Sequence, residues 1–234
     1  MNFINLIQII LIFFSTTISA FLALFALLFS KEASFIVAKN IWARSLCIIA
    51  RCNIITKGIN DLKDIEEPVI FCANHLSNFD IIALYMAIDR PVYFIAKKEL
   101  NKIPFLGWYM KAAGMVFIDR TNQTKAIHSL KEAGDLIRKG RNIITFPEGT
   151  RSQNGEMSTF KKGSFIISKK GNIPVVPVAI KNSNHINPNN SFLLNKGTIK
   201  VSFGKIIDNL SEFKNPLELA SYTKKEVEKL YLEL

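Results

Sequence analysis

The chain has 234 residues, of which 49% are hydrophobic, and its 30 Lys and Arg residues against 19 Asp and Glu residues give a formal net charge of +11. The charge favours anionic partners such as phosphates, acidic lipid surfaces, nucleic acid or an acidic protein, and the length allows one sizeable domain with an added segment. The three cysteines, Cys47, Cys52 and Cys72, lack metal-site spacing, and their odd number is typical of a reducing compartment. We therefore expect no bound metal.

The hydrophobic excess lies at the amino terminus. Phe3 to Phe29 is apolar almost throughout and as a helix would be about 40 Å long, more than the roughly 30 Å hydrocarbon core of a bilayer. No basic residue precedes Lys31, which disfavours a cleaved signal peptide and favours a cytoplasmic carboxyl side. The next segment, 33–50, has the mixed character of an interfacial helix, so a full span and a hairpin in one leaflet both remain open. We expect residues 1–52 to anchor the protein at the inner (cytoplasmic) membrane, with the rest facing the cytoplasm.

Residues 53–234 alternate between strand and helix patterns. The predicted strands are Ile54–Lys57, Val69–Ala73, Pro91–Ala96, Gly114–Ile118, Asn142–Phe146, Val175–Ile180 and Thr198–Phe203. The predicted helices are Ser77–Ala87, Thr121–Lys139, Lys162–Lys170 and Pro216–Leu234, with a broken helix in 99–110 and a loop after Lys181. This alternation predicts one α/β domain with a mixed, largely parallel sheet flanked by helices.

The first candidate site follows the strand Val69–Ala73. Ser77 and Asp80 have the spacing of a capping box, so a helix should begin at Ser77. On one continuous helix His75 and Asp80 would point about 140° apart, and they meet only if His75 lies in the turn and Asp80 in the first helical turn. An imidazole held by a carboxylate on one nitrogen can take a proton on the other. The alternative is a half-buried histidine beside a capping aspartate.

Two further strand ends carry polar residues. Arg120 follows the strand ending at Ile118, and the sequence P-E-G-T-R-S, residues 147–152, follows the strand ending at Phe146. In a parallel sheet these ends share one edge with His75, and the planar fork of arginine suits a phosphate. Gly149 allows close backbone approach, and Glu148 is expected to fix Arg151 or accept a substrate hydroxyl. Taken singly, an arginine at a strand end is more often a solvated surface charge and Glu-Gly-Thr-Arg more often a plain turn, whereas their joint occurrence favours a site.

Four segments in order resemble a known family. Asn74 to Asp80 matches the N-H-x-S-x-x-D (HX4D) block of the glycerolipid acyltransferases, specifically the 1-acyl-glycerol-3-phosphate acyltransferases. Residues 114–120 are similar to the second block, 146–152 reproduce the F-P-E-G-T-R-S block, and 173–178 resemble the fourth. The resemblance covers about residues 54 to 181.

The resemblance implies transfer of a fatty acyl group from a thioester, on acyl carrier protein or coenzyme A, to the 2-hydroxyl of lysophosphatidic acid at a membrane, giving phosphatidic acid. No cofactor beyond the co-substrate thioester and no acyl-enzyme is implied. His75 would act as general base and Asp80 would orient it. Substrate binding falls to residues at the same edge: Lys97, Arg120, Glu148, Gly149, Thr150 and Arg151. A backbone N–H near Gly149 or Asn74 would stabilise the oxyanion.

Other interpretations of the chain remain open. The first is a related acyltransferase with another acceptor, such as glycerol 3-phosphate or a lyso-aminolipid. The second is a non-catalytic membrane-bound module that binds anionic lipid, which the intact His75–Asp80 pair disfavours. Nucleic acid is not expected as a partner because no recognition motif is evident. Cys72 is expected to be a small buried hydrophobe, and His185 a surface residue. The lysine pair 161–162 is expected either to be solvated or to face an anionic bilayer or carrier protein.

Overall fold

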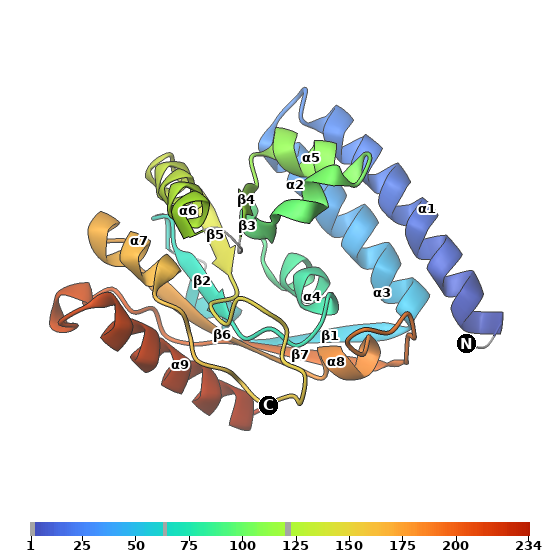
Figure 1. Cartoon of the computed structure of the whole chain (residues 1–234). Helices are drawn as coiled ribbons and strands as arrows, with labels where there is room; N and C mark the ends of the chain where they lie inside the picture. The colour runs from blue at the N-terminus through green and yellow to red at the C-terminus, as the bar shows by residue number, and fades with distance from the viewer. Residues whose placement is uncertain (1–2, 63–64, 120–122) are drawn as a thin grey trace.

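The computed structural model describes residues 3–62, 65–119 and 123–234. A seven-stranded sheet forms its centre, in the order β1-β7-β6-β2-β5-β3-β4 (Figure 1). All neighbouring strands are parallel except β6 and β7. The strands are β1 (Cys52–Lys57), β2 (Ile70–Ala73), β3 (Val92–Lys97), β4 (Val116–Ile118), β5 (Asn142–Thr145), β6 (Val175–Lys181) and β7 (Gly197–Phe203). The predicted fold class, a mixed and largely parallel α/β sheet, is confirmed.

Both faces of the sheet are covered by helices. Phe71 and Ala73 of β2 face one hydrophobic layer, and Ile70 and Cys72 face the other, as alternation along a strand requires. The first layer contains α4 (Phe79–Ala87), α5 (Leu106–Ala113) and the amino-terminal helices; the second contains α6 (Gln123–Arg138), α7 (Gly163–Gly171) and α9 (Pro216–Leu232). Strands buried on both sides read as continuous apolar runs, which explains the sequence of β2.

The amino-terminal helices form a hairpin packed on the first layer. α1 (Phe3–Ala26) is followed by a second helix made of α2 (Lys31–Val37), a π-helical turn (Ala38–Ala43) and α3 (Arg44–Ala50). The Ser30 hydroxyl begins α2 by accepting the Ala33 N–H at 2.9 Å, a regular N-cap. Both helices of the hairpin are long and apolar enough to cross a membrane.

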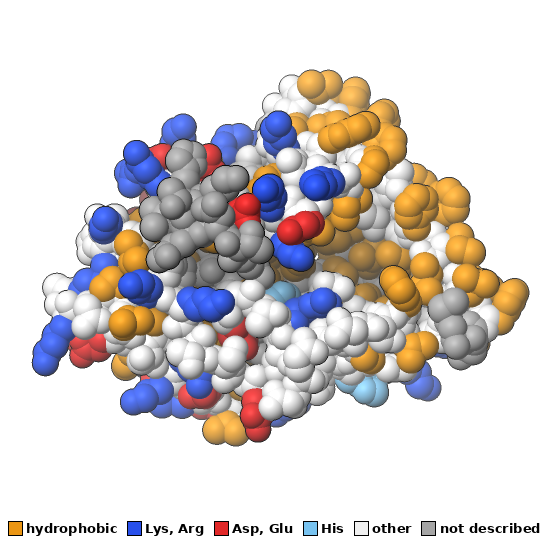
Figure 2. Space-filling view, viewed as in Figure 1, with side chains coloured by type: hydrophobic (Ala, Val, Ile, Leu, Met, Phe, Trp, Pro, Cys, Tyr) orange, Lys and Arg blue, Asp and Glu red, His pale blue; other side chains and the backbone are white. Residues whose placement is uncertain are grey.

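The polar interruptions of α1 lie on the face toward the second helix. Gln8 Nε2 donates to the Ile49 carbonyl at 2.8 Å, the Ser15 and Ser45 hydroxyls are 2.5 Å apart, and Trp42 Nε1 donates to Thr16 Oγ1. The opposite face of α1 exposes large apolar side chains to solvent, and Figure 2 shows hydrophobic side chains covering this side of the molecule. The polar residues thus hold the hairpin together, and the apolar ones point outward.

The structure corrects several predicted boundaries. Helix α4 begins at Phe79 rather than Ser77, because Ser77 serves as its cap: the Ser77 hydroxyl accepts the Phe79 N–H and the Asp80 carboxylate accepts the Ser77 N–H. The predicted loop after Lys181 contains one helical turn, α8 (Ser183–Ile186), preceded by Asn182 in the left-handed region at φ 71°. The broken helix predicted in 99–110 is a 3-10 helix, Lys98–Lys102, followed by α5.

Candidate active site

The candidate site lies where β2, β5 and β3 end. These strands are parallel and adjacent in the sheet, so the residues after each carboxyl end share one edge, as predicted. His75 follows β2, the turn 147–151 follows β5, and Lys97 ends β3. Arg120, predicted to join them from the end of β4, lies outside the described residues.

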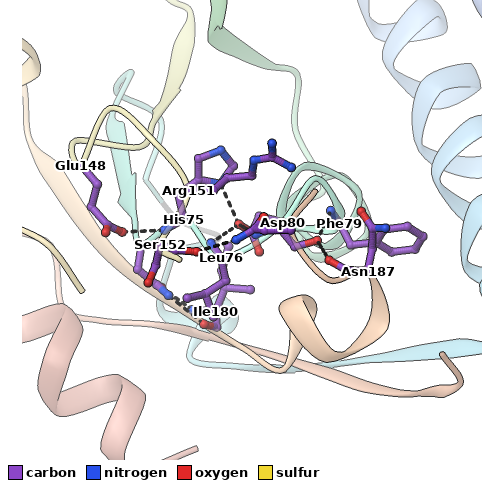
Figure 3. A network of polar contacts seen from close by, with 12 residues as sticks. His75, Leu76, Phe79, Asp80, Glu148, Arg151, Ser152, Ile180 and Asn187 are labelled. Carbon is purple, nitrogen blue, oxygen red and sulfur yellow. Dashed lines mark hydrogen bonds and ion pairs between the residues drawn. The ribbon is translucent and has the colours of Figure 1, made fainter. Parts of the chain in front are cut away.

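His75 and Asp80 meet as the spacing required. His75 lies in the turn after β2, Asp80 lies in the first turn of α4, and His75 Nδ1 is 2.7 Å from Asp80 Oδ2 (Figure 3). The Asp80 side chain is fully buried and that of His75 is 13% exposed. Asp80 Oδ2 also accepts the backbone N–H groups of Leu76 and Ser77, at 2.7 and 2.9 Å. These donors stabilise an ionised carboxylate, which in turn holds the His75 proton on Nδ1 and leaves Nε2 as an acceptor.

Phe146 fixes the plane of the imidazole. Its ring stacks on the His75 ring with centroids 4.0 Å apart and an interplanar angle of 16°. The family resemblance included Phe146 in its third block, but no role was predicted for it. The sequence did contain one signal for such a role. Phe146 is an aromatic residue between the end of a strand and Pro147, where a large side chain lies at the edge of the sheet.

Long-range hydrogen bonds lock the turn that carries His75. The Asn74 side-chain amide donates to the Ile180 carbonyl at 2.9 Å and accepts the Ile180 N–H at 2.7 Å. The Ser77 hydroxyl donates to the Asn187 carbonyl at 2.8 Å, and the Ser152 N–H donates to the His75 carbonyl at 2.8 Å. The turn is therefore tied to β6, to the end of α8 and to the segment after β5.

Glu148 takes a different place from the one expected. It is 2% exposed, its Oε1 accepts the His75 backbone N–H at 2.7 Å, and its Oε2 accepts both the N–H and the hydroxyl of Ser158 at 2.9 Å. Within the described residues it makes no ion pair with Arg151. Glu148 thus holds the His75 backbone, and its predicted contact with a substrate stays a prediction.

Cationic groups surround the turn after β5. The Arg151 guanidinium makes no hydrogen bond or ion pair with any described residue, and Figure 3 shows it extending past the His75 ring. Lys161 Nζ lies against Gly149, since a Cβ built on that glycine would be 2.8 Å from it. Lys97 is 60% exposed with its Nζ 3.7 Å from Glu99, and Thr150 is exposed. Lys161 was not among the predicted site residues, because a lysine in a lysine pair carries no distinguishing local signal.

Cys72 is excluded as a nucleophile by its position. Its side chain is fully buried in the second hydrophobic layer, and burial raises the pKa of its thiol far above the usual value. The described parts of the chain contain no group of three or more His, Cys, Asp or Glu side chains placed to hold a metal ion.

Comparisons with known proteins agree with this geometry. A family model described as Acyltransferase matches residues 53–181, more than half of the chain. The chloroplastic 1-acyl-sn-glycerol-3-phosphate acyltransferase of Arabidopsis thaliana is 33% identical over 187 residues, covering 78% of this chain and 52% of that protein. The 1-acyl-sn-glycerol-3-phosphate acyltransferase of Escherichia coli is 33% identical over 163 residues, covering 69% and 61%. The chain spans about half the length of several curated relatives that it matches.

A solved structure extends the match to nearly the whole chain. The crystal structure of the 1-acyl-sn-glycerophosphate acyltransferase PlsC from Thermotoga maritima superposes with a TM-score of 0.83 at 26% identity, covering 98% of this chain and 95% of that one. The match therefore includes the amino-terminal hairpin as well as the sheet. From the matched family model, the chain belongs to the acyltransferase family.

Proposed function

We propose that the protein transfers a fatty acyl group from acyl carrier protein or coenzyme A to the sn-2 hydroxyl of 1-acyl-glycerol 3-phosphate, giving phosphatidic acid. The observation that carries this proposal is the His75–Asp80 pair at a sheet edge beside Arg151, whose guanidinium has no partner among the residues that the structure describes. The names of the relatives from Arabidopsis thaliana and Escherichia coli support this acceptor.

The reaction follows from the orientation of His75. Nε2 removes the proton from the acceptor hydroxyl as its oxygen attacks the thioester carbonyl, and Asp80 stabilises the imidazolium that forms. Collapse of the tetrahedral intermediate breaks the carbon–sulfur bond, and the imidazolium returns the proton to the thiolate. A thioester is already activated, so no acyl-enzyme is needed. Phe146 and Glu148 act by holding the ring and the backbone of His75 in this geometry.

The cations around the turn after β5 are proposed to hold the acceptor phosphate. Arg151 offers a fork of donors, and Lys161 adds a point charge beside Gly149. Lys97 at the end of β3 and Arg120 after β4 complete the proposed set. With the phosphate bound there, the neighbouring hydroxyl comes within reach of Nε2.

The hairpin is proposed to attach the protein to one leaflet of the inner membrane. Its outer face is apolar, and its second helix packs on α4 and β1. A hairpin that crossed the bilayer would draw the outer edge of β1, the first strand in the sheet order, toward hydrocarbon, where unpaired backbone groups are costly. A hairpin that does not cross leaves the domain in the cytoplasm, where the chain is synthesised.

The test compares detergent-solubilised wild type with His75→Ala. Each receives acyl-coenzyme A or acyl-carrier-protein thioesters, with lysophosphatidic acid or glycerol 3-phosphate, and lipid products are followed; thermal unfolding confirms that both proteins are folded. Phosphatidic acid from the wild type alone is the expected result. Equal rates in the variant would refute the general base. Acylation of glycerol 3-phosphate but not of lysophosphatidic acid would refute the acceptor and leave the base in place.

A further inference from the structure

A polar hollow, separate from the candidate active site, lies beside the start of α1. Its volume is about 420 Å³, and its walls come from the start of α1, the end of α3, α8 and the segment before β7. None of its lining residues belongs to the candidate active site. Three of them carry or can carry positive charge: Arg51, His185 and Lys196.

The backbone around these three side chains is fixed. The Gly197 N–H donates to the Arg51 carbonyl at 3.3 Å, where β1 and β7 begin to pair. The Asn195 side chain donates to the His185 carbonyl at 2.8 Å. The cationic groups thus converge from separate parts of the sequence through defined hydrogen bonds, rather than from one charged run.

The hollow brings positively charged side chains together. Among the residues that the structure describes, the side chains of Arg51, His185 and Lys196 make no hydrogen bond or ion pair. The sequence supplies no carboxylate nearby along the chain, because segments 33–60 and 157–207 contain no Asp or Glu. Uncompensated charges gathered in a concave site attract an anion.

The backbone of Arg51 is an independent observation. Arg51 ends α3 in the left-handed conformation, at φ 53° and ψ 45°, where glycine or asparagine is the usual residue because a larger side chain is strained. A glycine would close α3 without that strain. The arginine occupies this position at a conformational cost, which points to a use for its side chain.

The position of the hollow indicates which anion it meets. Because β7 runs antiparallel to β6, the starts of β1 and β7 lie at the same edge of the sheet as the end of β2 and His75. Ile4 lines the hollow, and Ile48, one turn before Arg51, is 68% exposed. The hollow therefore begins where the outward apolar face of the hairpin ends, at the level that lipid headgroups occupy when that face is in a bilayer.

We propose that Arg51, His185 and Lys196 form a binding site for the phosphate of an anionic phospholipid headgroup at the membrane surface. The site is separate from the acceptor site at Arg151, and it rests on the proposed attachment of the hairpin to a leaflet. The helical turn α8 carries His185, and the Asn187 carbonyl that follows it accepts the Ser77 hydroxyl beside the active site. A headgroup held in the hollow would therefore fix the orientation of the active-site edge toward the membrane.

The test measures flotation with vesicles of phosphatidylcholine alone and of phosphatidylcholine with phosphatidylglycerol. The variant is Arg51→Asn with Lys196→Gln, since asparagine tolerates the left-handed backbone. The matched control is Lys205→Gln with Lys225→Gln, which removes the same charge from two exposed lysines after β7 and on α9. We expect the first double variant to lose about tenfold or more of the binding gained from phosphatidylglycerol, and the control to lose less than about threefold because its lysines are distant from that surface.

Each of the other possible results would contradict a different part of the proposal. Equal losses in the two double variants would overturn the site, because the effect would then be one of net charge. Wild-type protein that floats with neither vesicle would refute the membrane attachment itself. A third experiment titrates inorganic phosphate against the detergent-solubilised protein. If phosphate binding depends on Arg51 and Lys196 while wild type and the first double variant bind equally well to vesicles with phosphatidylglycerol, the hollow binds a soluble anion and the lipid assignment is overturned.

Discussion

At the scale of single residues, the proposed chemistry depends on which nitrogen of His75 carries its proton. Asp80 Oδ2 accepts from Nδ1 and from two backbone N–H groups. In Asp80→Asn, the amide oxygen takes the position of Oδ2, because the Leu76 and Ser77 N–H groups donate there, and the neutral amide no longer stabilises the imidazolium that forms during transfer. We expect kcat to fall by about 10²- to 10⁴-fold with little change in KM. Steady-state kinetics, with thermal unfolding as the control for folding, checks this. A loss confined to KM would contradict the orienting role.

The two cations at Gly149 and beside His75 are predicted to act on acceptor affinity. Arg151→Ala should raise KM for lysophosphatidic acid by about 10- to 100-fold and Lys161→Ala by about tenfold, because a hydrogen bond to a charged group contributes about 1.5–3 kcal/mol. Lys162→Ala is the matched control, since it removes the same charge from the next residue, which is exposed, and it should change KM little. If Lys162→Ala has as large an effect as Lys161→Ala, the ammonium at Gly149 is not a specific contact.

At the scale of elements, the turns after β2 and β5 depend on each other through Glu148. Its two oxygens accept three hydrogen bonds from His75 and Ser158 while the side chain is buried. Glu148→Ala leaves these donors without an acceptor, so we expect stability to fall by about 3 kcal/mol and kcat to fall with it. Glu148→Gln, which keeps one acceptor oxygen, should lose about 1 kcal/mol. Denaturant unfolding in detergent measures both. The exposed Glu156→Gln is the control, and a change there equal to that of Glu148→Gln would indicate a general charge effect.

The local sequence pattern predicts the turn after β2, but it does not predict the residues from other strands that contact this turn. The meeting of His75 and Asp80 depends on five residues of chain, a strand end and a cap, all of which leave a sequence pattern. The stacking of Phe146 and the pairing of Asn74 with Ile180 depend on β5 and β6 being the neighbours of β2. Asn74 and Ile180 are 106 positions apart, and strand alternation alone does not define the strand order. The meeting of His75 and Asp80 was thus predictable from the sequence, and the residues that position this pair were not.

At the scale of the whole molecule, one face of the hairpin packs on the sheet domain and the other exposes apolar side chains. Ala20 and Ala23 of α1 belong to the same hydrophobic cluster as the first layer of the sheet, whereas Phe14, Phe21 and Phe25 are 56%, 59% and 55% exposed. Gln8, Ser15 and Thr16, which interrupt the apolar sequence of α1, bond to the second helix. Attachment and folding should therefore be separable by mutation.

Replacing the three outward phenylalanines, in Phe14→Gln with Phe21→Gln and Phe25→Gln, should leave thermal unfolding in detergent unchanged and weaken binding to phosphatidylcholine vesicles by about a hundredfold. The partly exposed rings together contribute on the order of 3 kcal/mol of apolar burial in a bilayer. Ala23→Leu, on the inward face, should do the reverse, because overpacking a closed core costs about 1–3 kcal/mol while the outward face is untouched. Vesicle flotation and unfolding are measured on both variants. If the triple variant unfolds at a lower temperature than the wild type and still floats with vesicles, the outward face belongs to the folded core rather than to the membrane contact. The proposed orientation of the hairpin toward a leaflet would then be wrong.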